Sequence, residues 1–215
     1  MAKVYQASGL GHDPRLDELA RLATVEVVPP GRLDAMAPGA NQGVAAELKP
    51  RRDWTLKQLL DTQPSLLVGL DSIMDPQNLG AILRTAEVAG ADGAIVPEHR
   101  SAPLSAAAVK ASSGASELLP IAMVSGLPSA ITEVKRAGVW CVALDPRGEI
   151  RPWDFDFTQR VCVVVGSEGS GVRRLVKERC DARVRLPMAG KVASLNASAA
   201  ASALLYEVMR QRAAS

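Results

Sequence analysis

The chain has 215 residues and a formal net charge of +2, and 47% of its residues are hydrophobic, 3% aromatic and 22% charged. This length allows one domain of ordinary size plus a smaller one, and a charge this small does not by itself identify a nucleic-acid-binding protein. No apolar stretch reaches the roughly 18 residues of a membrane span, and the N-terminus lacks a signal-peptide hydrophobic region, so no membrane association is expected.

The first 50 residues predict a small α/β unit. Strands are expected at residues 3–7, 25–28 and 43–48, with a helix at residues 14–23. Residues 51–65 are polar and bounded by prolines, which predicts a linker. The main domain is therefore expected to occupy residues 66–215.

From Leu66 onward, short apolar runs alternate with helical patterns. Strands are predicted at residues 66–70, 93–96, 139–144 and 160–165, and helices at residues 76–89, 127–137 and 193–212. Uninterrupted apolar strands are typical of a parallel sheet that helices cover on both faces. Residues 182–186 alternate between polar and apolar, which predicts a strand nearer an edge. The sequence thus predicts an α/β fold with a mostly parallel sheet.

The cysteine and histidine patterns give no indication of a metal site. Cys141, Cys162 and Cys180 form no CxxC pair, and the first two lie inside apolar runs. An odd number of cysteines without metal-ligand spacing predicts buried thiols in a reducing compartment. His12 and His99 are too few for a metal cluster. We therefore expect a cytoplasmic protein that binds no metal.

Three polar motifs interrupt the apolar pattern of the main domain. A glycine-rich turn, Gly166-Ser167-Glu168-Gly169-Ser170-Gly171, follows an apolar strand. Upstream lies Asp75-Pro76-Gln77-Asn78-Leu79-Gly80 with Arg84, and downstream lie Leu186-Pro187-Met188-Ala189-Gly190 and Ser194-Leu195-Asn196-Ala197-Ser198. Two turns and one helix start of this kind predict a single site assembled from distant segments.

The glycine turn does not match the common nucleotide-binding loops. A P-loop requires Lys where Val172 stands, and a dinucleotide fingerprint that starts at Gly169 requires Gly where Arg174 stands. A turn without Cβ atoms still lets a ligand approach the backbone closely. A nucleotide-dependent oxidoreductase is therefore disfavoured, whereas another small-molecule site is not.

Each motif also has a plain structural interpretation. Asp75-Pro76 is a helix-start pattern, and Ser194 or Asn196 can cap the last helix. Glu168 can stabilise the start of a following helix, and Arg84 can extend to solvent from an otherwise apolar helix. Taken one at a time, these residues do not distinguish structure from function.

Together, the order and spacing of the motifs resemble the SpoU (TrmH-type) family of the SPOUT class. Members are knotted methyltransferases that methylate RNA ribose with S-adenosylmethionine. The resemblance runs from about Leu66 to Arg212. It implies a C-terminal trefoil knot, a homodimer and an RNA 2′-O-methyltransferase activity, with a guanosine of large-subunit ribosomal RNA as the favoured target. A transfer-RNA substrate and a non-catalytic RNA-binding relative are the alternatives.

The resemblance also implies roles for individual residues. The residues expected at the reaction centre are Arg84, Asn78, Glu168, Ser194 and Asn196. The residues expected to bind S-adenosylmethionine are Gly166, Gly171, Leu144, Leu186, Met188 and Leu195, with Leu186 and Leu195 as walls of the adenine pocket. Arg84 acts either as the base or as a cation that orients a phosphate and stabilises the developing alkoxide. No metal is needed for this chemistry.

The N-terminal unit carries a second, weaker resemblance. Residues 41–47 resemble the end of the RNA-binding domain, similar to ribosomal protein L30e, that precedes the catalytic domain in relatives. That domain normally begins with another strand and helix, and this sequence starts after them. We therefore expect a partial L30e-like domain over residues 1–50, either truncated or naturally reduced.

Overall fold

The computed structural model describes residues 3–39, 41–47, 52–191 and 194–214. The chain forms two compact units, Met1–Arg52 and Asp53–Ser215. The predicted linker over residues 51–65 is wrong in its extent, because helix α3 (Leu56–Asp61) forms there. Leu56 and Leu59 of α3 are buried in the core of the second unit, and apolar burial holds this segment to that unit.

The first unit is a three-stranded sheet with two helices. Its elements are β1 (Lys3–Ala7), α1 (Pro14–Leu22), β2 (Val25–Val28), α2 (Pro30–Met36) and β3 (Val44–Glu47). The strand order is β2-β1-β3, with β2 parallel and β3 antiparallel to β1. The sequence pattern did not predict α2, which begins with Pro30 and buries Leu33 against Tyr5 and Val28. Leu48, at the end of the third predicted strand, lies outside the described residues.

The second unit contains a six-stranded sheet in which every strand pair is parallel. Its strands are β4 (Leu66–Asp71), β5 (Gly93–Pro97), β6 (Ile121–Val124), β7 (Trp140–Leu144), β8 (Val161–Gly166) and β9 (Ala182–Val184). The order β6-β5-β4-β8-β7-β9 places β9 at an edge, as its alternating pattern predicted. The four-residue β6 at the other edge was not predicted.

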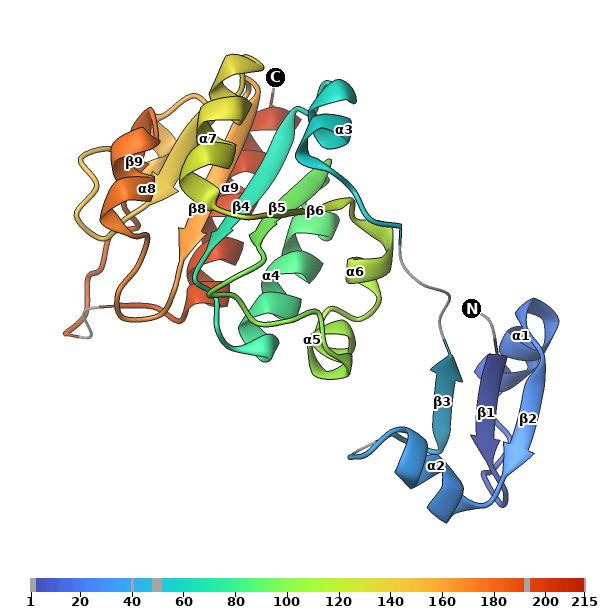
Figure 1. Ribbon diagram of the computed structural model, residues 1–215. Coiled ribbons are helices and arrows are strands. Elements are labelled where there is room, and N and C mark those ends of the chain that lie inside the picture. The colour runs from blue at the N-terminus through green and yellow to red at the C-terminus, as the bar shows by residue number, and fades with distance from the viewer. Residues whose placement is uncertain (1–2, 40, 48–51, 192–193, 215) are drawn as a thin grey trace. The chain divides into compact units, whose positions relative to one another are not determined.

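Helices cover both faces of this sheet (Figure 1). They are α4 (Pro76–Val88), α5 (Ala106–Ala111), α6 (Ala115–Leu118), α7 (Leu127–Arg136), α8 (Arg174–Arg179) and α9 (Ala197–Ala213), with a 3-10 turn, η1 (Pro152–Asp154). Val68 and Leu70 of β4 pack in the core that includes α4 and α9, whereas Leu67 packs in the core with α3, α7 and α8. The predicted α/β fold is confirmed; the trefoil knot and the L30e-like domain stay predictions.

The last helix begins later than its pattern predicted. The expected start at residue 193 is wrong: Ala193 lies outside the described residues, and α9 begins at Ala197. The side chain of Asn196 accepts hydrogen bonds from the backbone N–H groups of Ser198 and Ala199, at 2.9 and 3.3 Å. This N-cap fixes the start of the helix.

The three cysteines are free thiols. Cys141 and Cys162 are fully buried on the paired strands β7 and β8. A hydrogen bond with Cys162, together with burial, raises the pKa of the Cys141 thiol, and burial raises the pKa of Cys180. The thiols of Cys141 and Cys180 therefore stay protonated at neutral pH.

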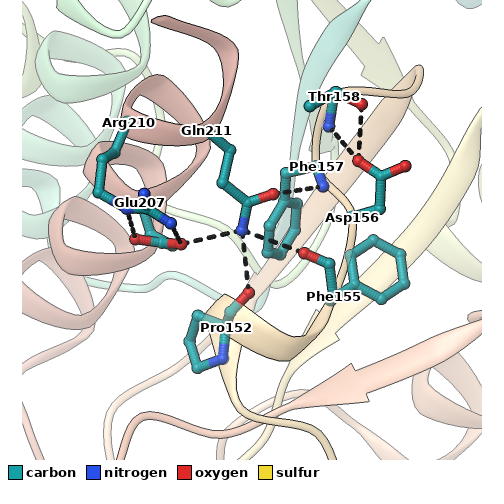
Figure 2. Close-up of polar contacts among 8 residues, drawn as sticks. All are labelled: Pro152, Phe155, Asp156, Phe157, Thr158, Glu207, Arg210 and Gln211. Carbon is teal, nitrogen blue, oxygen red and sulfur yellow. Dashed lines mark hydrogen bonds and ion pairs between the residues drawn. The ribbon is translucent and has the colours of Figure 1, made fainter. Parts of the chain in front are cut away.

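The side chain of Gln211 helps to tie the C-terminal end of α9 to the segment between β7 and β8 (Figure 2), and the neighbouring Arg212 also bonds to that segment. Its amide nitrogen donates to the backbone oxygens of Pro152 and Phe155 and to the carboxylate of Glu207, at 3.3, 3.1 and 2.8 Å. Its amide oxygen accepts from the backbone N–H of Phe157 at 2.9 Å. Four hydrogen bonds on one amide therefore anchor this end of the helix.

We predict that Gln211→Ala lowers the free energy of unfolding by about 1–3 kcal/mol, because it leaves part-buried backbone groups unpaired. Urea unfolding followed by tryptophan fluorescence measures this, since Trp54, Trp140 and Trp153 all lie in the second unit. As a control, Arg210→Ala removes only an exposed ion pair with Glu207 and should cost less than about 1 kcal/mol. Equal losses in the two variants would contradict the anchoring role.

Candidate active site

The glycine turn after β8 folds back on its own start. Gly166 is the last residue of β8, and a Cβ atom there would lie 2.0 Å from the carbonyl carbon of Gly171 and 2.1 Å from the nitrogen of Val172. Gly169 and Gly171 have φ angles of +84° and +64°, which glycine adopts at low cost. A side chain at position 166 would therefore open the turn.

A buried carboxylate closes the turn on its other side. Asp71, which is fully buried, pairs with Gly166 in the β4–β8 register. Its two oxygens accept hydrogen bonds of 2.7 Å from the backbone N–H and the Nε of Arg173, where the turn ends. Neither residue was singled out from the sequence. The sequence did contain a signal, an aspartate at the end of an otherwise apolar strand. A charged side chain in such a position is buried and therefore needs a partner of opposite charge.

The turn forms one wall of a pocket with a volume of about 330 Å³. All six residues expected to bind S-adenosylmethionine line it: Leu144, Gly166, Gly171, Leu186, Met188 and Leu195. The carboxyl ends of β7 and β8 provide its floor, and the segments before and at the start of α9 provide its other walls. Met188 and Leu195 are 43% and 42% exposed, so this side of the pocket is open to solvent.

The three motifs meet at the edge of this pocket. The side-chain nitrogen of Asn196 donates to Asn78 at 2.9 Å and to Glu168 at 3.5 Å. Asn196 therefore caps α9 and also joins the first motif to the glycine turn. Ser194 lines the pocket and does not cap the helix. Four of the five residues expected at the reaction centre are thus gathered in one place.

Arg84, the fifth of these residues, lies apart from them. It is exposed on α4, six residues after Asn78, and it lines neither this pocket nor the one next to it. It forms no hydrogen bond or ion pair with another residue that the structure describes. Asp75 and Pro76 start α4 as predicted, since Asp75 accepts from the backbone N–H groups of Gln77 and Asn78. Within one chain, Arg84 is therefore separate from the pocket.

Neither a metal cluster nor a membrane helix appears in the described part of the chain. No three His, Cys, Asp or Glu side chains lie together in a way that could hold a metal ion. No described helix is long and apolar enough to cross a membrane. The polar side chains at the pocket and its edge are amides, hydroxyls, the Glu168 carboxylate and the Arg185 guanidinium.

The part of the chain that builds this site also matches a known family. The model of the SpoU rRNA Methylase family matches residues 65–206, a range that contains all three motifs. The chain belongs to this family. The predicted membership, and with it the methyltransferase class, is therefore confirmed.

Individual SpoU proteins resemble the chain over almost all of its length. The 23S rRNA (guanosine-2′-O-)-methyltransferase RlmB of Pseudomonas syringae pv. tomato is 41% identical over 213 residues, which are 94% of this chain and 85% of that protein. The SpoU methyltransferase AviRb from Streptomyces viridochromogenes superposes with a TM-score of 0.80 at 30% identity. The superposition covers 99% of this chain and 82% of the AviRb chain.

A second structure of AviRb contains the cofactor AdoMet, which is S-adenosylmethionine. It superposes with a TM-score of 0.75 at 29% identity, over 99% of this chain and 83% of AviRb. The SpoU family therefore includes a protein of the same fold that binds the cofactor predicted from the motifs.

In this SpoU chain, the Asp71 carboxylate is expected to hold the turn in its ligand-binding shape. Asp71→Asn removes the charge that pairs with Arg173 and should lower the free energy of unfolding by about 1.5–3 kcal/mol. It should also weaken S-adenosylhomocysteine binding about tenfold, a loss of roughly 1.4 kcal/mol. Isothermal titration calorimetry measures the second effect.

Asp181→Asn is the matched control. Asp181 also accepts from a backbone N–H, that of Cys141 at 2.9 Å, and pairs with Lys135 at 2.7 Å, but it lies at the amino end of β7 and away from the pocket. We expect a smaller loss of stability, because Asp181 is more exposed than Asp71, and an unchanged ligand affinity. Equal affinity losses in the two variants would show that Asp71 acts through stability alone.

Proposed function

We propose that this chain is an S-adenosylmethionine-dependent RNA ribose 2′-O-methyltransferase that acts on a guanosine of large-subunit ribosomal RNA. The observation that carries the proposal is the contact of Asn196 with both Asn78 and Glu168, which joins three distant motifs at one pocket. The ribosomal guanosine target is supported by the identity with RlmB over most of the chain.

The pocket has the chemistry that S-adenosylmethionine requires. Leu144, Leu186 and Leu195 give it apolar walls that suit an adenine ring. The absence of a Cβ at Gly166 leaves the turn closed, so that its backbone can approach a ligand. A volume of about 330 Å³ lies within the usual range for small-molecule sites. These residues are the ones that we propose hold the methyl donor.

When bound, the cofactor supplies an electrophilic methyl group, and the chain must place a ribose hydroxyl in line with it. No histidine is among the described residues that line the pocket. Asn78, Asn196, Ser194 and Glu168 can orient the ribose through hydrogen bonds. For Arg84 we propose a cationic role, because a guanidinium can stabilise the developing alkoxide without losing its proton.

We also propose that the protein is a homodimer whose contact includes the outer faces of α4 and α9. These helices are joined by a 3.0 Å hydrogen bond between Thr85 and Ser202. Their outer faces expose Val88 and Tyr206, at 53% and 55%, together with small alanines. An apolar face of this kind favours association. Arg84 lies on the same face, so a dimer would let it serve the pocket of the partner chain.

The proposal extends to the rest of the chain. We propose that the first unit contributes to RNA binding, in keeping with the resemblance of residues 41–47 to an L30e-like domain. The free, buried thiols suit a reducing compartment. We therefore place the enzyme in the cytoplasm, where its RNA substrate is made.

The function is tested by methyl transfer to unmodified large-subunit ribosomal RNA, with the product nucleoside identified by mass spectrometry. The wild type should form 2′-O-methylguanosine and bind S-adenosylhomocysteine but not NAD. Arg84→Ala should transfer methyl groups roughly 100- to 1,000-fold more slowly with unchanged S-adenosylhomocysteine affinity. Arg84→Lys should recover little of the methyl-transfer rate, because lysine lacks the planar guanidinium group of arginine.

Arg136→Ala is the matched control for Arg84→Ala, since Arg136 is exposed at the end of α7 and lines neither the donor pocket nor its neighbour. It should transfer methyl groups at the wild-type rate. Transfer to transfer RNA alone would contradict the proposed substrate. Failure to bind S-adenosylhomocysteine would contradict the proposed function as a whole.

The dimer is tested by mixing two inactive variants. Gly166→Val forces the turn open, and Arg84→Ala removes the cation, so each homodimer should be inactive. After subunit exchange, about a quarter of the wild-type activity should return, since half of the dimers are mixed and each has one intact site. A monomer of 22.6 kDa in sedimentation equilibrium would refute the dimer, and a dimer without recovered activity would refute the shared site.

A further inference from the structure

A second pocket lies directly beside the donor pocket. Its volume is about 470 Å³, and it shares Ser167, Glu168 and Ala197 with the first pocket. Asn78 lines it as well, so the cluster of Asn78, Asn196 and Glu168 lies where the two pockets meet. Because in-line transfer requires the two reacting atoms to be about 3–3.5 Å apart, an acceptor must enter next to the donor. The second pocket offers that position.

Two loops at the carboxyl ends of neighbouring strands build the far side of this pocket. The loop after β4 contributes Ser72 and Ile73, and the loop after β5 contributes Arg100. The backbone N–H of Ala102 donates to the oxygen of Ile73 at 2.7 Å, and the hydroxyl of Ser101 donates to the same oxygen at 3.4 Å. These bonds fix Arg100 at the pocket wall.

The side chain of Arg100 is exposed and lacks a hydrogen bond or ion pair to any residue within the described ranges. Two carboxylates, Asp75 and Glu168, line the same pocket. Asp75 is engaged in capping α4, and Glu168 accepts from Asn196. The guanidinium is therefore a cation at the pocket wall that is free to pair with an incoming anion, and its planar fork matches a phosphate.

The backbone at this position is strained. Arg100 has a φ of +59° and Ser72, on the facing loop, has a φ of +61°. Residues other than glycine, asparagine and aspartate seldom adopt this left-handed conformation. Strain of this kind concentrates at functional sites. A glycine would adopt the Arg100 conformation freely, so backbone geometry does not account for an arginine here.

We propose that the second pocket receives the target nucleotide of the RNA, and that Arg100 binds a phosphate flanking its ribose. This inference rests on the proposed function and adds to it the place of the acceptor and a residue that no sequence motif indicated. Arg100 is in this view a residue that binds substrate and takes no part in proton transfer. Its removal raises the KM for RNA and leaves the affinity for the methyl donor unchanged.

The test uses Arg100→Gly in the full chain, because glycine removes the side chain and accepts the left-handed backbone. The KM for unmodified large-subunit ribosomal RNA should rise about tenfold or more, as expected for a lost charge-assisted hydrogen bond. The salt dependence of RNA binding should weaken, with a log–log slope smaller by about 0.7–1. S-adenosylhomocysteine affinity and thermal stability should not fall.

Two further variants separate the effect of the Arg100 charge from that of its planar guanidinium and from an effect on folding. Arg100→Lys keeps the charge, so it should keep the salt slope and regain only part of the affinity for RNA. Asparagine also adopts the left-handed conformation, so Arg100→Asn should change the KM and the salt slope as Arg100→Gly does. If one of these two variants fails to fold, the other still provides the test.

Gln63→Gly is the matched control for the backbone change. Gln63 has a φ of +56° and is exposed before β4, at the opposite end of that strand, so its replacement should leave KM and salt slope unchanged. If the wild type methylates RNA and Arg100→Gly keeps the wild-type KM and slope, the inference is wrong while the proposed function stands. If the wild type neither binds S-adenosylhomocysteine nor methylates RNA, both are wrong.

Discussion

The fully buried carboxylate of Asp71 is the contact on which the site depends, because it stands at both ends of the glycine turn. Its backbone pairs with Gly166 at the start of the turn, and its side chain holds Arg173 at the end. A turn this tight cannot be kept closed by glycines alone, since glycine has the largest conformational freedom in the unfolded chain. The ion pair supplies the order that the glycines lack, and the pocket wall follows from it.

The rest of the site depends on the parallel sheet. Because β4 and β8 are neighbours, their carboxyl ends place the first motif beside the glycine turn, although about ninety residues separate them in the sequence. Helix α9 crosses the same region and is fixed at both ends, by Asn196 at its start and by Gln211 near its end (Figure 2). A helix held in this way can position Ser194 and Asn196 reproducibly.

The unpaired arginines suggest how a chain with a net charge of only +2 can recognise a polyanion. Arg100 lies at the second pocket and Arg84 on the outer face of α4, and neither is neutralised by another described residue. Individually placed cations give directed phosphate contacts where a uniformly basic surface would give non-specific attraction. This arrangement suits an enzyme that must select one nucleotide within a large RNA.

The sequence by itself determined the parallel α/β fold and the edge position of β9, because apolar runs and alternation are local properties, and the resemblance of its motifs to the SpoU family indicated six residues that line the first pocket. It could not determine that Asp71 closes the turn, that Asn196 is at once a helix cap and a link between motifs, or that Arg100 stands at a pocket. These roles depend on contacts between residues up to 118 positions apart, which only strand order decides. The sequence also predicted a linker where α3 forms. Leu56 and Leu59 of α3 are buried by residues distant in the sequence, in the core of the second unit, and the local pattern carries no sign of those residues.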